Sequence, residues 1–163
     1  MAKKSKQYTT EQIQKAEQTV WELGGDILSS EGMQKSKHFM QHGDVSVYQH
    51  CFSVAVRCVL KAQNKKVDLR SLVRGALLHD YFLYDWHVAD PSHRLHGIHH
   101  AKTALKNAER DFTLNKIERN MIRSHMFPLG FVLPLYRESR ILYFADKYCA
   151  VQETLVEKEK RKI

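Results

Sequence analysis

From Asp68 to Asp80 the chain reads DLRSLVRGALLHD, and this stretch decides the fold class. Its apolar residues recur at spacings of three and four, the period of an amphipathic helix; they are Leu69, Leu72, Val73, Ala76 and Leu77. Asp68 is a typical N-cap, and the apolar pattern ends at His79 and Asp80. The stretch therefore predicts a core helix that carries a histidine and a carboxylate at its C-terminal end.

Helical periodicity also precedes this stretch. It predicts a first helix over about 9–23, which the glycine pair 24–25 ends, and a short helical stretch over about 33–40. Asp44 is expected to cap a long core helix that reaches the polar turn 63–66. Three helices therefore come before the decisive one.

Further helices are expected after it. Apolar residues repeat helically over about 98–108, and Thr113 is expected to cap a helix that ends near His125. Pro134 is well placed as the first residue of a last helix, which runs into the charged tail. No alternating pattern typical of strands appears.

Size and composition agree with a helical domain. The chain has 163 residues, 43% of them hydrophobic, which is enough for one domain with one core. The 27% charged residues, with only 3 prolines and 7 glycines, argue against disorder. We expect an all-α, compact single-domain bundle of six or seven helices with essentially no sheet. It should occupy 1–163, with a core at about 44–150 and basic, solvated ends at about 1–8 and 157–163.

The formal net charge of +8 is concentrated at the two ends of the chain. The residues involved are Lys3, Lys4, Lys6, Lys158, Lys160, Arg161 and Lys162. A nucleic-acid-binding surface would instead interleave Lys and Arg with aromatic residues or along one helix face. We expect no specific nucleic-acid binding, whereas a basic surface suits a small phosphorylated substrate.

The cysteines and the N-terminal segment bear on location. Cys51, Cys58 and Cys149 cannot all pair within one chain, and none forms a CxxC motif. No apolar run that would serve as a signal peptide or membrane span follows the basic N-terminus. We expect a cytoplasmic protein with reduced thiols and no membrane partner; the sequence indicates no oligomeric state.

The pair His79-Asp80 is the first candidate for chemistry. It follows an apolar helix, where free carbonyl groups and the negative end of the helix dipole favour a cation. Imidazole nitrogen and carboxylate oxygen together suit a divalent ion. The structural alternative is a polar pair that simply ends a helix, because two-residue motifs occur often by chance.

Two further residues strengthen the metal hypothesis. Asp146 lies in the apolar segment 141–146, where a buried carboxylate needs either a metal or an opposite charge such as Arg or Lys. His50 lies in the long core helix, as a ligand or as a hydrogen-bonded residue at the edge of the core. His125 follows Met121 and Ile122 by four and three residues, so it should project toward the core.

The order of these residues resembles the HD-domain superfamily of metal-dependent phosphohydrolases. The resemblance spans about residues 44–150. Its pieces are the segment from Asp44 to His50 leading into Val54–Arg57, Gly75–Asp80, Leu95–Gly97, His125–Pro128 and Phe144–Lys147. Each piece is short, but their order and helical spacing together are specific.

The resemblance implies a metal site. His50, His79, Asp80 and Asp146 would bind one divalent ion, and Asp80 would bridge to a second. His96 and His125 would complete that second site. His96, His99 and His100 crowd one segment, so His100 is the alternative to His96. One or two ions are expected, and the sequence does not distinguish among Mn, Fe, Ni, Co, Mg and Zn.

The same resemblance implies an enzyme that hydrolyses a phosphate ester or anhydride by attack of a metal-bound hydroxide. Asp80 and His79 would be the catalytic residues. Lys147, Arg94 and Arg123 are candidates to hold the substrate phosphate, although a solvated surface charge is the alternative for each. The aromatic residues of 81–86 would line a pocket that stacks a nucleobase or would fill the core. Nucleotides are the first expected substrates.

Two other functions stay open. One is a phosphodiesterase acting on cyclic or dinucleotides, although the Gly-Tyr-Pro signature of the dinucleotide-cleaving branch does not follow Asp80. The other is a non-catalytic regulator that binds metal or nucleotide. Because every expected ligand position is filled, and buried ligands without a partner are costly to keep, catalysis is the favoured interpretation.

Overall fold

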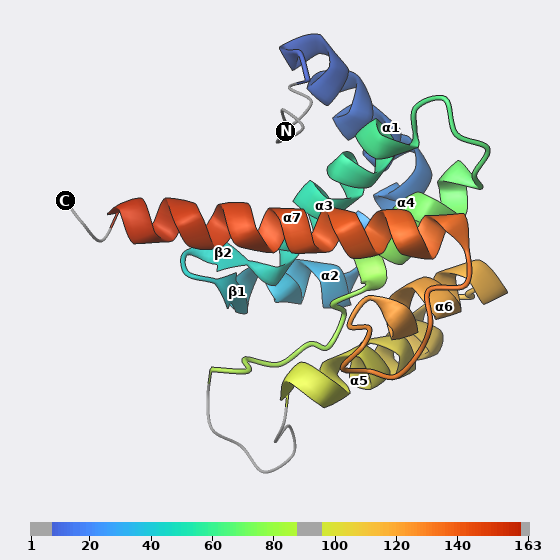
Figure 1. Ribbon diagram of the computed structural model, residues 1–163. Coiled ribbons are helices and arrows are strands. Elements are labelled where there is room, and N and C mark those ends of the chain that lie inside the picture. The colour runs from blue at the N-terminus through green and yellow to red at the C-terminus, as the bar shows by residue number, and fades with distance from the viewer. Residues whose placement is uncertain (1–7, 88–95, 161–163) are drawn as a thin grey trace.

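The structure is a computed structural model that describes residues 8–87 and 96–160. These residues form seven α-helices, one turn of 3₁₀-helix and a two-stranded hairpin (Figure 1). The helices are α1 (Thr10–Leu28), α2 (Glu31–Lys35), α3 (Val47–Ala62), α4 (Leu69–Leu78), α5 (His96–Asp111), α6 (Lys116–Ser124) and α7 (Arg137–Lys160). The short elements are η1 (Ser36–His38), β1 (Met40–His42) and β2 (Val45–Ser46). The predicted all-α bundle is confirmed.

Helix α3 lies at the centre of the bundle and packs against α1, α4 and α7. Figure 1 shows α7 lying across the other helices, with α1 on one side of it and α5 and α6 on the other. Leu72 and Leu77 of α4 and Leu142 of α7 are fully buried in the shared core. Helix α4, the decisive stretch of the sequence, is therefore enclosed, and its C-terminal end lies inside the molecule.

The first helix passes through the glycines that were expected to end it. It continues to Leu28, and Gly24 is buried within it. A Cβ added at Gly24 would lie 2.4 Å from Leu77 Cδ1. The prediction of a helix end at residues 24–25 was wrong because Gly24 allows α1 and α4 to approach each other closely, rather than ending the helix.

The segment before α3 also differs from the expectation. Instead of one helical stretch over about 33–40, the chain forms α2, η1 and then the antiparallel hairpin of β1 and β2. Gly43, with a φ of 56°, allows the tight turn between the strands. The N-cap of α3 is Ser46 rather than Asp44, since the Ser46 hydroxyl accepts from Gln49 N and the Gln49 side chain accepts from Ser46 N.

Two other helix starts were predicted at the wrong residue. Asn115, not Thr113, caps α6, because its side chain accepts from two backbone N–H groups of the first turn. Helix α7 begins at Arg137 rather than at Pro134. The side chain of Asn120 on α6 bonds the backbone of Leu133 and Leu135, which holds this part of the chain against α6 before α7 begins.

Helix α7 is the longest element of the described chain, at 24 residues. It contacts α3, α4, α6 and β1. Its length places residues several turns apart along one side of the central helix α3. Neither α7 nor any other helix among the described residues combines the length and apolar character needed to cross a bilayer.

Candidate metal centre

Six buried histidine and aspartate side chains meet between five helices. They are His50 on α3, His79 and Asp80 at the end of α4, His100 on α5, His125 at the end of α6, and Asp146 on α7. Two groups of three bring one potential ligand atom from each residue within 4.8 Å of the others. Residues separated by up to 96 positions in the sequence thus form one cluster.

The first group joins α3, α4 and α7. His50 Nε2 lies 3.2 Å from Asp146 Oδ1, and His79 Nε2 lies 3.6 Å from the same oxygen. Asp80 Oδ2 faces this group too, 3.5 Å from His79 Nε2 and 3.9 Å from His50 Nε2. Ligands held about 2.1 Å from one ion lie about 3 to 3.5 Å apart, so these four atoms are close to the spacing of a coordination shell.

The second group is built on the other oxygen of Asp80. His100 Nε2 and His125 Nε2 each lie 3.3 Å from Asp80 Oδ1, and the two nitrogens are 2.9 Å apart. Asp80 therefore directs one carboxylate oxygen to each group. This is the arrangement of a carboxylate that bridges two ions.

Two of the histidines end helices, and this fixes which ring nitrogen faces the cluster. His79 is the C-cap of α4 and His125 is the C-cap of α6. His79 Nδ1 donates to the Ala76 carbonyl at 2.7 Å, and His125 Nδ1 donates to the Ile122 carbonyl at 2.8 Å. The last carbonyls of a helix have no partner within it, so they are available as acceptors. Each ring is thereby held with Nε2 toward the carboxylates.

Comparison with protein-family models matches residues 47–151 to the HD domain. The chain belongs to the HD domain family. Searches of curated proteins and of solved structures gave no match. The predicted resemblance is confirmed. Proteins with an HD domain are in general metal-dependent phosphohydrolases, and two His/Asp groups of this HD domain have the composition to hold a metal.

The protonation of this HD domain centre reflects burial opposed by neighbouring charges. Burial disfavours the charged form of His50, but hydrogen bonds to Asp146 and Glu153 outweigh it and raise its pKa to about 10. Burial likewise acts against a charged His79, yet the adjacent Asp80 carboxylate raises its pKa well above the usual range. Both imidazoles therefore carry a proton near neutral pH when no other cation is present.

The pKa values of the two carboxylates, Asp80 and Asp146, are lowered instead of raised. Burial acts to raise the pKa of Asp80, but the charge of His79 and hydrogen bonds from His100 and His125 hold it well below its usual range. Burial also acts to raise the pKa of Asp146, and hydrogen bonds from His50 and His79 hold it well below that range. The HD domain centre thus keeps two ionised carboxylates in its interior, where they need a cation.

The residues fit a divalent metal ion. His79 Nε2 and Asp80 Oδ1 are buried, and their contacts at 3.3 to 3.6 Å are too long or too poorly aligned to satisfy them fully, which is costly unless another group does so. Imidazole nitrogens and carboxylate oxygens suit borderline divalent ions. His50, His79, Asp80 and Asp146 would hold one ion, and Asp80, His100 and His125 would hold another.

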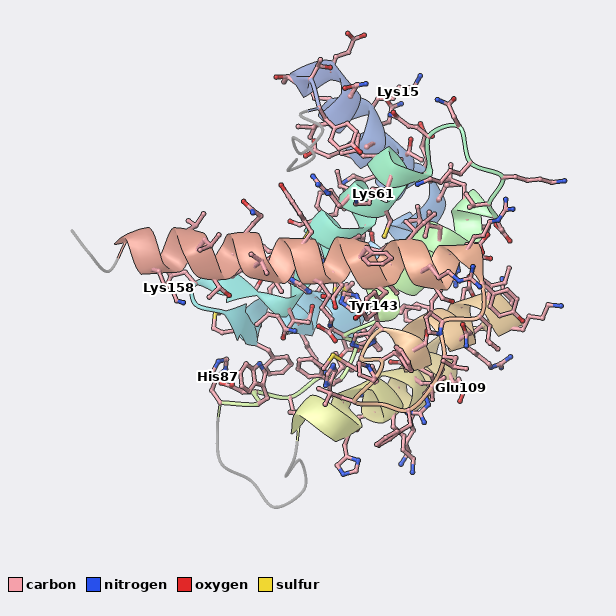
Figure 2. All side chains as sticks on the ribbon, viewed as in Figure 1. Lys15, Lys61, His87, Glu109, Tyr143 and Lys158 are labelled. Atoms are coloured by element: carbon pink, nitrogen blue, oxygen red, sulfur yellow. The ribbon has the colours of Figure 1, made fainter. Side chains whose placement is uncertain are left out.

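The structure brings some of the predicted histidines into the metal centre and leaves others outside it. It brings His50, His79 and His125 into the cluster, and it places His100 in the position for which His96 was the first choice. The side chain of His96 lies outside the described part of the structure. His87 lies at the edge of the molecule, where it contacts Asp85 and is 45% exposed (Figure 2).

Of the predicted phosphate-binding residues, Lys147 lies at the centre. Its Nζ donates to Asp146 Oδ2 at 2.9 Å, while 42% of the side chain stays exposed. Arg123 is half-buried on α6, two residues before His125. Two residues correspond to about 200° around a helix, so Arg123 projects from a different side of α6 than His125. Arg94 lies outside the described residues.

The aromatic segment after Asp80 divides into a buried and a partly buried part. Tyr81 and Phe82 are buried in the core, 1% and 2% exposed. Tyr84 and Trp86 are only partly buried. The Tyr84 ring packs on Phe82 at 4.9 Å, and the Phe82 ring packs on His100 at 5.9 Å. The inner part of the segment thus fills the core and reaches the metal centre through Phe82, whereas its outer part is only partly buried.

Two residues at the HD domain centre were missed in the sequence. Gln41 of β1 is buried and donates from Nε2 to Asp80 Oδ2, and Glu153 of α7 bonds His50. Gln41 carried no signal, since it directly follows a segment expected to be helical and precedes the expected break. Glu153 follows Asp146 by seven residues, or two helical turns, so helical spacing alone was enough to place both on one side of α7.

Proposed function

We propose that this protein is a metal-dependent phosphohydrolase that cleaves a phosphate ester or anhydride of a small molecule, with nucleotides as the first substrate class. The observation that carries the proposal is that Asp80 forms one buried group with His100 and His125 and directs its other carboxylate oxygen to the second buried His/Asp group. A single polar pair at a helix end would not need two histidines facing each of its carboxylate oxygens. Two adjacent cation sites suit the transfer of a phosphoryl group to water.

Bound divalent ions would supply an activated water and neutralise charge on the phosphoryl oxygens. The chain itself does the positioning. Asp80 holds the two groups together, and the Gln41 amide fixes its carboxylate by donating to Oδ2. The backbone bonds of His79 and His125 prevent their rings from turning away.

The position of Lys147 favours a negatively charged substrate. Its ammonium group contacts Asp146 on the inner side and remains partly open to solvent on the other. An arriving phosphate would therefore meet a positive charge beside the ligand carboxylates. The neighbouring Met126 sulfur, 3.5 Å from Nζ, helps to hold the side chain in this place.

The partly exposed rings of Tyr84 and Trp86 favour a substrate with an aromatic base. Tyr84 is partly exposed and packs on Phe82, whose ring reaches His100, and Trp86 is partly exposed two residues further along the chain. Burial raises the pKa of Tyr84 to about 12, and the negative charge of Asp80 adds to this shift, so the phenol lies within electrostatic reach of the centre. Base stacking on such rings contributes about 1 to 3 kcal/mol per base.

The test is a screen for phosphate release from phosphorylated metabolites, with Mn²⁺, Co²⁺, Ni²⁺ and Mg²⁺ supplied separately. The panel should include nucleoside mono-, di- and triphosphates, cyclic dinucleotides and sugar phosphates. Asp80→Ala is the inactive control. Glu109→Ala is the matched control, because Glu109 is exposed at the outer edge of the molecule and forms an ion pair with Arg119, away from the metal centre (Figure 2).

We expect turnover of at least one compound by the wild type and by Glu109→Ala, and none by Asp80→Ala. Full activity of Asp80→Ala on the same compound contradicts the proposal. Tight binding of metal and nucleotide without turnover of any compound instead supports a regulatory binding protein. Selective cleavage of cyclic dinucleotides supports the phosphodiesterase alternative.

A further inference from the structure

Glu153 contacts the metal centre from outside the ring of candidate ligands. Its Oε2 and Oε1 lie 2.9 and 3.1 Å from His50 Nδ1. The Glu153 side chain is 12% exposed and the His50 side chain is fully buried. Glu153 also lies beyond the segment that matches the HD domain, which ends at residue 151. The residue that makes this contact thus lies outside the matched segment, on the same helix α7 as Asp146.

The contact lies on the side of the imidazole that faces away from the cluster. His50 Nε2 faces Asp146 and Asp80, whereas Nδ1 faces Glu153. An ionised carboxylate accepts hydrogen bonds but cannot donate them, so Nδ1 must carry the proton. When a metal ion displaces the proton of Nε2, the lone pair of that nitrogen is therefore the one that binds the ion.

The position of His50 in its helix explains why a side chain, and not a backbone carbonyl, accepts the hydrogen bond from its Nδ1. His79 and His125 lie at helix ends, where unpaired backbone carbonyls accept from their Nδ1 atoms. His50 is the fourth residue of α3, and the carbonyls before it belong to the hydrogen-bond ladder of the helix. An acceptor for Nδ1 must therefore come from another element, and α7 supplies it.

We propose that Glu153 is a positioning residue that orients His50 and strengthens it as a metal ligand through a carboxylate–imidazole pair. The inference rests on the metal-binding part of the proposed function only. Loss of such an outer carboxylate weakens metal binding about tenfold to a hundredfold in general. Glu153 itself does not coordinate the ion, because the imidazole ring stands between its carboxylate and the cluster.

The test is a titration of metal-free protein with Co²⁺, followed by calorimetry and by the absorption spectrum of the bound ion. The variants are Glu153→Ala, which removes the acceptor, and Glu153→Gln, which keeps an acceptor oxygen without the charge. Gln152→Ala is the matched control, because Gln152 is the adjacent exposed residue of α7. Thermal melting of the metal-free variants reports their folding.

We expect Glu153→Ala to bind Co²⁺ about tenfold to a hundredfold more weakly, with a changed absorption spectrum and a stably folded metal-free state. Glu153→Gln should fall between it and the wild type, and Gln152→Ala should match the wild type. Wild-type affinity and spectrum in Glu153→Ala overturn the proposal. If Glu153→Ala does not fold, Glu153→Gln decides, since an affinity equal to that of the wild type overturns the proposal.

The titration separates this inference from the proposed function. Binding of Co²⁺ by the wild type, unaffected by the loss of Glu153, removes only the role of Glu153. Failure of the wild type to bind any Co²⁺ contradicts both the role of Glu153 and the proposed metal-dependent function. Glu153→Ala could weaken Co²⁺ binding although the wild type hydrolyses none of the phosphorylated compounds. That result supports the positioning role of Glu153 and contradicts the proposed phosphohydrolase function.

Discussion

At the scale of single residues, the centre balances two buried carboxylates with two protonated imidazoles. Asp80 and Asp146 stay ionised because His50 and His79 face them. The pKa of His50 rises to about 10 for the same reason, despite the opposing effect of burial. A divalent cation would supply the same two positive charges at the same place, so metal binding must displace protons.

The first prediction concerns this exchange. Between about pH 6 and pH 9, metal affinity should rise about tenfold per pH unit for each proton displaced. Calorimetry in buffers of different ionisation enthalpy should detect proton release on binding. His50→Gln should release fewer protons than the wild type. Binding that is independent of pH, with no proton release, contradicts the charge balance.

The stability of the metal-free protein should depend on pH in a related way. The pKa of His50 is higher in the folded protein than its ordinary value of 6.5, so its stabilising contribution is complete below about pH 6.5. It is lost as the pH rises toward 10. Urea unfolding of metal-free protein should give a free energy of unfolding that falls over this range, and His50→Gln should reduce the fall. A stability that rises with pH here contradicts the assignment.

Individual site residues differed in how well the sequence predicted them. The pair His79-Asp80 and the buried Asp146 could be found, because a charge among apolar residues with helical spacing indicates a need for a partner. The choice between His96 and His100 could not be made from sequence, since both lie in one histidine-rich segment. Gln41 could not be found, because a glutamine is an ordinary surface residue until the fold turns it inward.

At the scale of elements, helix ends and helix contacts determine the geometry of the centre. Helices α4 and α6 each end in a histidine whose Nδ1 binds the carbonyl three residues earlier. The periodicity of the helices could be read from the sequence. Their caps could not, because Asp44 and Thr113, near Ser46 and Asn115, are also residue types that commonly cap helices. The β1–β2 hairpin could not either, because its strands are only three and two residues long.

The adjacent glycines of α1 give a matched prediction at this scale. A Cβ at Gly24 would lie 2.4 Å from Leu77 Cδ1 and 3.2 Å from Val73 Cγ1, whereas at Gly25 the nearest atom, of Trp21, is 3.9 Å away. Gly24→Ala should therefore destabilise the protein by about 1 to 3 kcal/mol through overpacking. Gly25→Ala should stabilise it by roughly 0.5 to 1 kcal/mol through better helix propensity.

Urea unfolding of both variants checks this prediction. The opposite signs at neighbouring positions distinguish close helix packing from a general effect of alanine. Equal stabilisation by both substitutions would show that α1 and α4 do not approach each other at Gly24.

At the scale of the whole molecule, the candidate ligands connect five helices that are distant in the sequence. Metal binding should therefore stabilise the complete fold rather than one segment. An ion present at about 100 times its dissociation constant adds about 2.7 kcal/mol to the free energy of unfolding. For a domain of this size that raises the melting temperature by roughly 5 to 10 °C.

Differential scanning fluorimetry with and without Mn²⁺ or Co²⁺ measures this shift. Asp80→Ala should show no increase, because Asp80 directs one carboxylate oxygen to each group. A shift of equal size in Asp80→Ala would place the stabilising ion elsewhere on the protein.

The most direct test of the account is anomalous diffraction from crystals of the protein grown with Mn²⁺. We predict an anomalous peak about 2.2 Å from His50 Nε2, His79 Nε2 and the carboxylate oxygens of Asp80 and Asp146. A second peak should lie between Asp80, His100 and His125 when both sites are filled. Crystals of metal-loaded protein with no anomalous peak between these six side chains would contradict the assignment of the metal centre.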